Sequence, residues 1–519
     1  MLYDILIKNA TIFDGTGARS FKSNLVIKNG KIIKIGEEVD EKSCQHIFNA
    51  DKRYLCPGFI DIDNVSDHYL TLFNNLSCDN LIKQGITSII IGHEGSSLAP
   101  LIKNTLISFK PWANTESLNV DWRSFKTFLN LIKEKGIGVN IGSLIGWNVM
   151  RSGLVGESFR NLSDFELKQL TILAKQSMRE GSLGISFGFG YPSGRAISKR
   201  EVLSVYHEIK KFNPLFSFNL RDESIGFLTA VKEVIDNAKE QKINTLITGF
   251  KVQNEDNFSN FDVALKLIEN INAQIDKKIH FSIYPYDYTC QTLYSFLPDW
   301  LTIGGDQSIK NNLEDKNIVK KLVKELKQNK GFYKKLVLVD IEDKYKMLKG
   351  KTFEAIAKNL NLSIEETIVK ILSITQGKII VLNLNLSMFN IDKGIKNNYS
   401  IVATNGMSLG TADFIDRRST NGMIKYLTTY QKILPFENVI NKITGMPKEK
   451  LGLESKGYIK IGMDADLVIL NPQTIEDQSS IQKPMIEPKG IEAVIINGQI
   501  AYNEGKIIND KLGTIIRKH

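Results

Sequence analysis

Cysteine is scarce in this chain of 519 residues. The four cysteines, Cys44, Cys56, Cys78 and Cys290, lie far apart, and no two have the Cys-x-x-Cys spacing of zinc or redox motifs. This excludes a small secreted domain held together by disulfides. We expect the four to be reduced thiols in a cytoplasmic protein, or small core residues.

Long hydrophobic runs are also absent. No stretch approaches the roughly 18 apolar residues that a membrane-spanning helix requires. The first residues, MLYDILIKNATIFDG, alternate apolar and polar side chains, which is typical of a strand and not of a signal peptide. We therefore expect a cytoplasmic protein with no membrane partner.

The chain has no basic block either. It contains 67 Lys and Arg against 57 Asp and Glu, a net charge of +10, but the basic residues are spread along the sequence. Nucleic-acid recognition requires clustered as well as excess positive charge, so we expect no nucleic-acid partner. Hydrophobic residues at 42% and charged residues at 24% are ordinary for a globular protein.

What the sequence does contain is clearest at its two ends. Residues 1–53 and 452–519 hold short alternating strands, and each end carries an Asn-Gly pair, Asn29-Gly30 and Asn497-Gly498, that is typical of a hairpin turn. We predict that the two ends combine into one small β-sandwich domain.

The middle, residues 54–451, alternates apolar strands with amphipathic helices. Together with the strand that ends at Asp61, the predicted strands are 85–92, 136–146, 182–190, 214–221, 243–251, 279–287 and 399–406. Eight such units predict an α/β fold, a (β/α)8 TIM barrel, whose active site lies at the carboxyl ends of the strands. An insertion at about 290–398 is rich in Lys and Asn with helical periodicity, and is either a lid or a solvated helical excursion.

Several landmarks occur in a specific order. They are PGFID at 57–61, GITSIIIGHEGSSLAP at 85–100, LGISFGFGYPSG at 183–194, LRDES at 220–224, YPYDYTCQTLYSFLPDW at 284–300 and KITGMPKEKLGLESKGYIKIGMDADLVILNPQTIED at 442–477. With these landmarks the chain resembles the amidohydrolase superfamily and, within it, the N-acyl-D-amino-acid deacylases, or D-aminoacylases. The resemblance implies a barrel enzyme that hydrolyses non-peptide amide bonds at a zinc site.

The metal ligands that the resemblance implies are replaced in this chain. Their positions hold Asp63, Val65, Glu94, Asn219, Gly249 and Asn405. A zinc site needs three or four nitrogen, sulfur or oxygen ligands, and of these six residues only Asp63 and Glu94 are suited to hold a cation. We therefore expect no cofactor and do not expect zinc.

The substrate contacts that the resemblance implies are better preserved. They are Tyr191, Arg221, Lys251, Tyr284, Tyr286 and Arg418. Arginine binds a carboxylate through a fork of two hydrogen bonds, and lysine binds it as a point charge. An equally weighted alternative is that Arg221 and Lys251 pair with Asp222, Glu223 or Glu94 at the barrel rim.

The positive charge of Lys251 leads to a hypothesis about the former metal space. Without a cation, buried acids at the barrel mouth need another positive partner. We expect a Glu94–Lys251 or Asp63–Lys251 ion pair to fill the space.

Three functions compete. The favoured one is a metal-independent pseudoenzyme that binds an acyl-amino-acid-like or carboxylate ligand, or a protein partner. The second is an enzyme of altered chemistry, with Asp63, Glu94 and Lys251 as the catalytic candidates for acid–base or nucleophilic work. The third is a deacylase with an unusual metal site on Asp61, Asp63 and Glu94.

Overall fold

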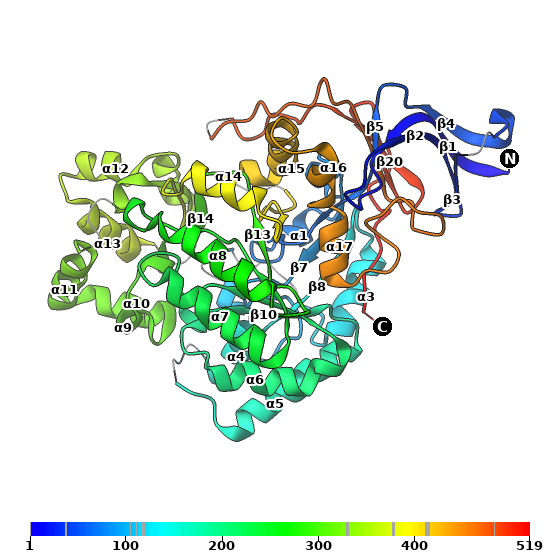
Figure 1. The fold of residues 1–519 in the computed structure, drawn as a ribbon. Coiled ribbons are helices and arrows are strands. Elements are labelled where there is room, and N and C mark those ends of the chain that lie inside the picture. Colours follow the sequence, from blue (N-terminus) through cyan, green and yellow to red (C-terminus); the bar gives the residue numbers. More distant parts are fainter. Residues whose placement is uncertain are drawn as a thin grey trace.

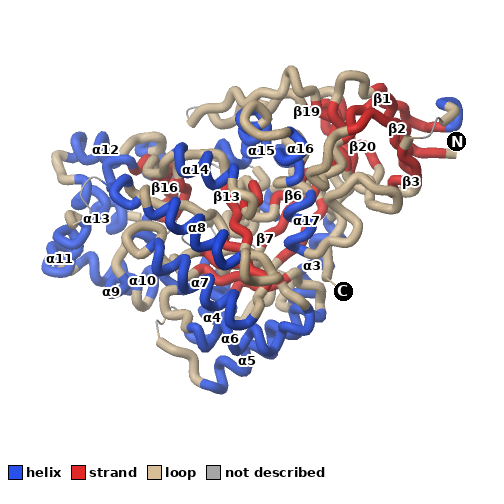
Figure 2. The backbone as a smooth tube through the Cα atoms, viewed as in Figure 1, coloured by secondary structure: helices blue, strands red, loops and turns tan. Residues whose placement is uncertain are grey.

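The computed structural model has an α/β barrel at its centre, with a β domain at one end and the insertion at the other (Figure 1). It describes residues 2–36, 39–103, 105–109, 112–113, 115, 120–156, 158, 160–328, 332–375, 379–409, 416–481 and 483–518. The barrel strands lie inside a surrounding layer of helices (Figure 2). In the described part of the chain, no helix is both long and apolar enough to cross a membrane.

The barrel strands run parallel and form two hydrogen-bonded groups. One group is β6 (Phe59–Asp61), β7 (Ile86–Ile91) and β8 (Asn140–Ser143); the other is β9 (Ile145–Gly146), β10 (Gly184–Gly188), β11 (Leu215–Asn219), β12 (Asn244–Ile247), β13 (His280–Ile283) and β17 (Ser400–Val402). Because β8 and β9 are two halves of one segment, eight strands result. The predicted (β/α)8 fold is confirmed.

Helices connect and surround these strands. They are α1 (Thr71–Asn74), α2 (Asp79–Ile82), α3 (Phe125–Lys135), α4 (Trp147–Val155), α5 (Asp164–Arg179), α6 (Lys199–Ile209), α7 (Phe227–Gln241), α8 (Asn260–Asn272), α14 (Met388–Lys396), α15 (Arg417–Tyr430), α16 (Phe436–Asn441) and α17 (Gly445–Leu451). Helix α5 illustrates why they form: Ser163 and Glu166 make a capping box at its start. Leu167, Leu170 and Met178 then recur at helical spacing and are buried on its inner face.

Both ends of the chain contribute to one sheet. Its strands are β1 (Tyr3–Ile12), β2 (Phe21–Lys28), β3 (Lys31–Ile35), β4 (Cys44–Asn49), β5 (Tyr54–Pro57), β18 (Leu467–Leu470), β19 (Ile491–Ile496), β20 (Gln499–Asn503) and β21 (Lys506–Ile507). The antiparallel pair β5–β18 joins the N-terminal strands to the C-terminal ones. Asn29 and Asn497 both have positive φ, as the predicted Asn-Gly hairpin turns require.

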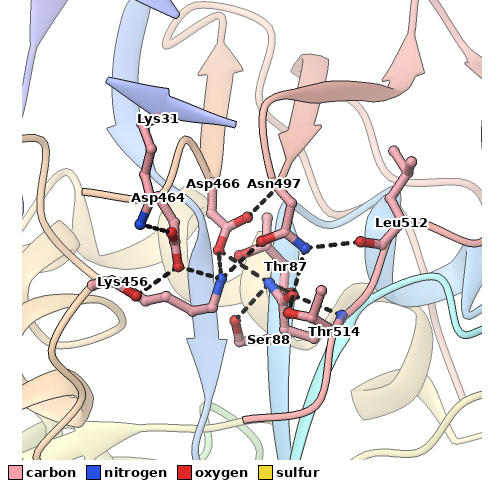
Figure 3. A network of polar contacts seen from close by, with 11 residues as sticks. Lys31, Thr87, Ser88, Lys456, Asp464, Asp466, Asn497, Leu512 and Thr514 are labelled. Atoms are coloured by element: carbon pink, nitrogen blue, oxygen red, sulfur yellow. Dashed lines mark hydrogen bonds and ion pairs between the residues drawn. The ribbon is translucent and has the colours of Figure 1, made fainter. Parts of the chain in front are cut away.

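A buried polar network fastens this β domain to the barrel (Figure 3). The Lys456 ammonium lies 2.6 Å from Asp466 Oδ2 and 3.1 Å from Asp464 Oδ2. On barrel strand β8, Asn140 donates to Asp466 Oδ2 at 3.0 Å and accepts from Asn497 Nδ2 at 2.8 Å. The orientation of the two parts is thus set by satisfied polar groups as well as by apolar packing.

The insertion has a core of its own and more β structure than the sequence suggested. Its helices are α9 (Asp299–Thr302), α10 (Gly305–Glu314), α11 (Lys316–Leu326), α12 (Phe353–Leu360) and α13 (Ile364–Ile374), and its antiparallel sheet has the order β14 (Thr289–Thr292), β16 (Ile379–Asn383), β15 (Leu336–Ile341). The expectation of a purely helical insertion was therefore incomplete, because these short strands pair across long separations in sequence.

Candidate functional site

A polar cavity of about 390 Å³ lies at the carboxyl ends of the barrel strands, beneath the insertion. The barrel contributes Glu94, Asn219, Lys251, Tyr284, Asn405 and Arg418 to its wall, and the insertion contributes Gln291, Phe296, Asp299, Phe332 and Tyr333. The structure thus has a cavity at the position that the sequence predicted for the active site. Since insertion residues form part of the wall, the insertion is not an excursion away from the site.

Lys251 pairs with Glu223, from the loop after β11. Its Nζ lies 2.5 Å from Glu223 Oε1 and donates to the Gly249 carbonyl oxygen at 3.0 Å. Burial, the largest single effect, would lower the pKa of this ammonium, but Glu223 together with Tyr284 and Glu94 outweighs it, so the pKa is raised. The hypothesis that Lys251 forms an ion pair with Glu94 or Asp63 is wrong, because the neighbouring loop supplies a closer carboxylate. The alternative, a pair between Lys251 and Glu223 at the barrel rim, is what the structure has.

Arg418 is the second cation of the cavity. Its Nε donates to Asp416 Oδ2 at 2.6 Å, its Nη1 donates to Asn405 Oδ1 at 2.8 Å, and its guanidinium lies 4.9 Å from the centre of the Tyr284 ring. Asp416 also accepts from the Tyr288 hydroxyl at 2.7 Å. Among the described residues, Arg418 Nη2 has no hydrogen-bond partner, so part of the fork remains free to bind a ligand.

Arg221 lines the same cavity but is already engaged. Its Nε and Nη2 donate to the two carboxylate oxygens of Glu233 at 3.0 and 2.7 Å. The remaining bonds go to the carbonyl oxygens of Arg195 and Ile197, at 2.8 and 3.1 Å. The guanidinium also lies over the Phe189 ring. Such a saturated arginine holds loops together and has little left for a substrate carboxylate.

Glu94 stands between the polar cavity and a smaller one. Its Oε2 accepts from the Tyr191 hydroxyl, and His68 Nδ1 lies 3.8 Å away. Burial raises the pKa of this carboxyl, with His68 opposing the shift. The smaller cavity, of about 90 Å³, shares Glu94 and Tyr191 with the larger one and is otherwise lined by side chains that include Trp112, Val149, Tyr294 and Ile309.

Asp63 lies outside the cavity wall. It is fully buried and accepts from Ser282 Oγ at 2.7 Å and from Asn405 Nδ2 at 3.4 Å. Asn405 therefore bridges Asp63 and Arg418. Of the other predicted contacts, Tyr191, Tyr284, Lys251 and Arg418 line the cavity, whereas Tyr286 is buried outside it and its hydroxyl donates to the Arg417 carbonyl oxygen.

The remaining positions of the implied metal site hold no charged side chain. Val65 packs in an apolar cluster with Tyr284 and Tyr286, and Asn219 lines the cavity. Gly249 has a φ of +54°, and a Cβ placed there would lie 3.4 Å from Lys251 Nζ. In the described part of the chain, no three His, Cys, Asp or Glu side chains come together as a metal site. These residues do not fit a conventional zinc centre.

Comparisons with known proteins find similar proteins over almost the whole chain. Residues 403–502 match the model of the Amidohydrolase family. The N-acyl-D-aspartate deacylase of Alcaligenes xylosoxydans xylosoxydans is 22% identical over 99% of this chain and 95% of its own length. The D-aminoacylase of the same organism is 21% identical over 99% of this chain and 98% of its own length.

Over almost its whole length the chain is similar to D-aminoacylases and related deacylases. Solved structures agree on the fold. A D-aminoacylase studied for its binuclear metal centre superposes with a TM-score of 0.83 at 21% identity, covering 99% of both chains. The N-acyl-D-glutamate deacylase of Bordetella bronchiseptica has a TM-score of 0.84 at 18% identity, covering 100% of both.

These structures correct the expectation that this D-aminoacylase-like protein has no cofactor and no zinc. The D-aminoacylase has a binuclear metal centre, and the N-acyl-D-glutamate deacylase is a complex with zinc and a phosphonate inhibitor. The expectation was wrong because it rested on the residue types at the six positions alone, without the metal-containing structures that match the whole chain. The donor set described above still does not match a conventional centre.

Sequence reasoning missed two residues that shape the cavity. Asp416 fixes Arg418, and Gln253 donates to Glu223 Oε2 at 2.7 Å. A signal for Asp416 does exist in the sequence, because an aspartate directly before a helix is a typical N-cap, and its side chain accepts from the Arg418 N–H at 3.0 Å. Nothing local marks Gln253, whose partner comes from another strand end.

Proposed function

We propose that this D-aminoacylase-like protein binds N-acyl amino acids or closely related carboxylates in the polar cavity, and turns them over slowly or not at all. The observation that carries the proposal is the pair Arg418 and Lys251 on one cavity wall. The cavity volume of about 390 Å³ is within the range of small-molecule sites.

Both cations have hydrogen-bond donors to spare. Arg418 has Nη2, and Lys251 uses two of its three N–H groups, for Glu223 and Gly249, among the described residues. A carboxylate would bind by sharing these donors with Asp416 and Glu223, which already neutralise the two charges. Because the site carries little net positive charge, we expect specificity from geometry and a moderate affinity.

The neighbouring apolar cavity favours an amphipathic ligand. Its wall meets the polar cavity at the Glu94–Tyr191 hydrogen bond. A ligand with a carboxylate at Arg418 and a small apolar group beyond Tyr191 would occupy both spaces. An N-acyl amino acid has this distribution of charge and apolar surface.

Low turnover is proposed from the residues at the strand ends. Four of the six positions at which the family resemblance places metal ligands hold Val65, Asn219, Gly249 and Asn405, none of which ionises.

The second candidate function is that of a working deacylase. It is favoured by the names of the relatives that match the full chain and by the two acids that remain, Asp63 and Glu94.

Calorimetry with N-acetyl-D-glutamate and N-acetyl-D-leucine tests binding. Arg418→Gln should weaken binding about tenfold or more, because a charge-assisted fork is lost. Arg417→Gln is the matched control, since Arg417 faces Asp477 and Ser479 instead of the cavity. If the affinity stayed the same in both variants, the proposed site would be contradicted. Release of free amino acid in assays supplied with zinc would establish the second candidate instead.

A further inference from the structure

Lysine side chains gather at the end of the barrel opposite the polar cavity. Asn213 comes just before β11 and Lys278 just before β13, so both lie at the amino ends of the strands, whereas the cavity lies at the carboxyl ends. Lys450, on α17, is held at the same end, because its carbonyl oxygen accepts from the side chain of Asn244, the first residue of β12, at 3.0 Å. These lysines are therefore separate from the site described above.

Hydrogen bonds bring three ammonium groups together here. Lys277 Nζ donates to Asn213 Oδ1 at 2.7 Å, and Lys518 Nζ donates to the carbonyl oxygen of the same asparagine. Lys450 Nζ donates at 2.7 Å to the carbonyl oxygen of Lys278, the residue directly after Lys277. Three segments that are far apart in the sequence thus bring their positive charges to one place.

No carboxylate neutralises these charges among the residues that the structure describes. The hydrogen bonds of Lys277, Lys450 and Lys518 all go to neutral oxygen atoms. Burial lowers the pKa of Lys450 to about 7 and that of Lys518 to about 8, and the charge of Lys277 lowers both further. Since an ammonium group has three N–H donors, each lysine keeps donors for a ligand.

Two features separate this cluster from an ordinary basic surface. Lys450 is 5% exposed, and a buried ammonium without a counter-charge is costly unless a ligand supplies one. Lys210 and Lys211, both exposed, come shortly before Asn213 and extend the positive field toward solvent. The Lys278 ammonium takes no part, because it donates to the carbonyl oxygens of Asn272 and Ile275 at the end of α8.

We propose that Lys277, Lys450 and Lys518 form a second binding site, for a doubly charged phosphate group that is either free or part of a phosphate monoester. Such a group has several acceptor oxygens and can accept from all three ammonium groups, whereas a carboxylate would neutralise only one charge. Lys450 is the inner contact, and the exposed Lys277 borders the solvent. A ligand that binds only the folded chain also stabilises it. This inference goes beyond the proposed function, because the ligand is not the substrate and binds at the other end of the barrel.

Calorimetry on the full chain tests the site, with inorganic phosphate and glycerol 3-phosphate as separate probes at pH 7 and constant ionic strength. Lys277→Gln and Lys450→Met should each weaken binding about tenfold or more, because each removes one of three charges. The exposed position of Lys277 keeps the test valid even if Lys450→Met does not fold. Tighter binding of the monoester would assign the site to an organic phosphate, and tighter binding of inorganic phosphate would assign it to the free anion.

Two control variants locate the bound anion. Lys168→Gln, at an exposed position on α5, should leave phosphate affinity unchanged. Arg418→Gln should also leave it unchanged, because Arg418 belongs to the polar cavity. Binding that is lost in Arg418→Gln but kept in Lys277→Gln would place the anion in that cavity and overturn the second site, as would the absence of saturable phosphate binding. Failure of N-acyl amino acids to bind would leave these results untouched, so the two proposals fail independently.

Discussion

Lys251 Nζ lies 2.5 Å from Glu223 Oε1, and both side chains are nearly buried. Removing one partner of such a pair leaves an unpaired charge in a poorly solvated site. We expect Lys251→Met to lower the free energy of unfolding by about 2–4 kcal/mol in urea denaturation. The double variant Lys251→Met/Glu223→Gln should recover most of that loss. If the double variant were no more stable than Lys251→Met, the pairing would be of no energetic consequence.

Gly249 provides a second prediction. Its φ of +54° is unfavourable for any residue with a Cβ, and that Cβ would lie 3.4 Å from Lys251 Nζ. Gly249→Ala should therefore cost about 1–2 kcal/mol of stability, chiefly from backbone strain. Gly505→Ala is a useful comparison, because its φ is +84° and nothing lies within 4 Å of the added Cβ. A Gly249→Ala protein as stable as the parent would show that this backbone can relax.

The sequence predicted the barrel because each strand is a short apolar run followed by an amphipathic helix, and both patterns are local. Strands β14, β15 and β16 are equally short but pair across long stretches of chain, so no local pattern marks them. The same limit applied to Lys251. Its residue type predicted an ion pair, but the choice of Glu223 over Glu94 depends on how two strand-end loops approach each other.

Arg221 illustrates the limit for function. Its place at a strand end and its charge favoured a carboxylate contact, and the structure does put it on the cavity wall. Its donors, however, are used by Glu233 and two carbonyl oxygens, none of which the sequence could single out. Position in the barrel was predictable, while the number of free donors was not.

Lys450 predicts a pH dependence of stability. Burial lowers the pKa of its ammonium to about 7, with Lys277 adding to the shift, and the ammonium donates to the Lys278 carbonyl oxygen at 2.7 Å. The unfolded chain therefore binds more protons than the folded one between about pH 7 and 10, and stability should rise with pH across this window. The slope approaches about 1.4 kcal/mol per pH unit for one such group.

Replacing Lys450 tests this assignment. Lys450→Met should flatten the rise in unfolding free energy between pH 7 and 9.5, measured by urea denaturation at both values. Some rise should remain, because burial also lowers the pKa of Lys442 to about 7. An unaltered slope in Lys450→Met would mean that this ammonium titrates alike in the folded and unfolded chain.

Lys456 predicts how firmly the β domain is attached. Its ammonium is paired with Asp464 and Asp466 and also donates to Asn497 Oδ1 at 3.0 Å (Figure 3). Asp466 in turn accepts from Asn140 on the barrel, so losing the lysine leaves a carboxylate uncompensated at the junction. We expect Lys456→Met to destabilise the protein by about 3–5 kcal/mol. Lys460→Met, at an exposed position four residues on, should change stability by less than about 0.5 kcal/mol.

Hydrogen exchange shows where the Lys456→Met protein opens. Since the junction joins both ends of the chain to β8, exchange should rise first at 464–467 and 494–498, ahead of the barrel strands. Simultaneous exposure of β8 and β10 would mean that the two parts unfold as one unit.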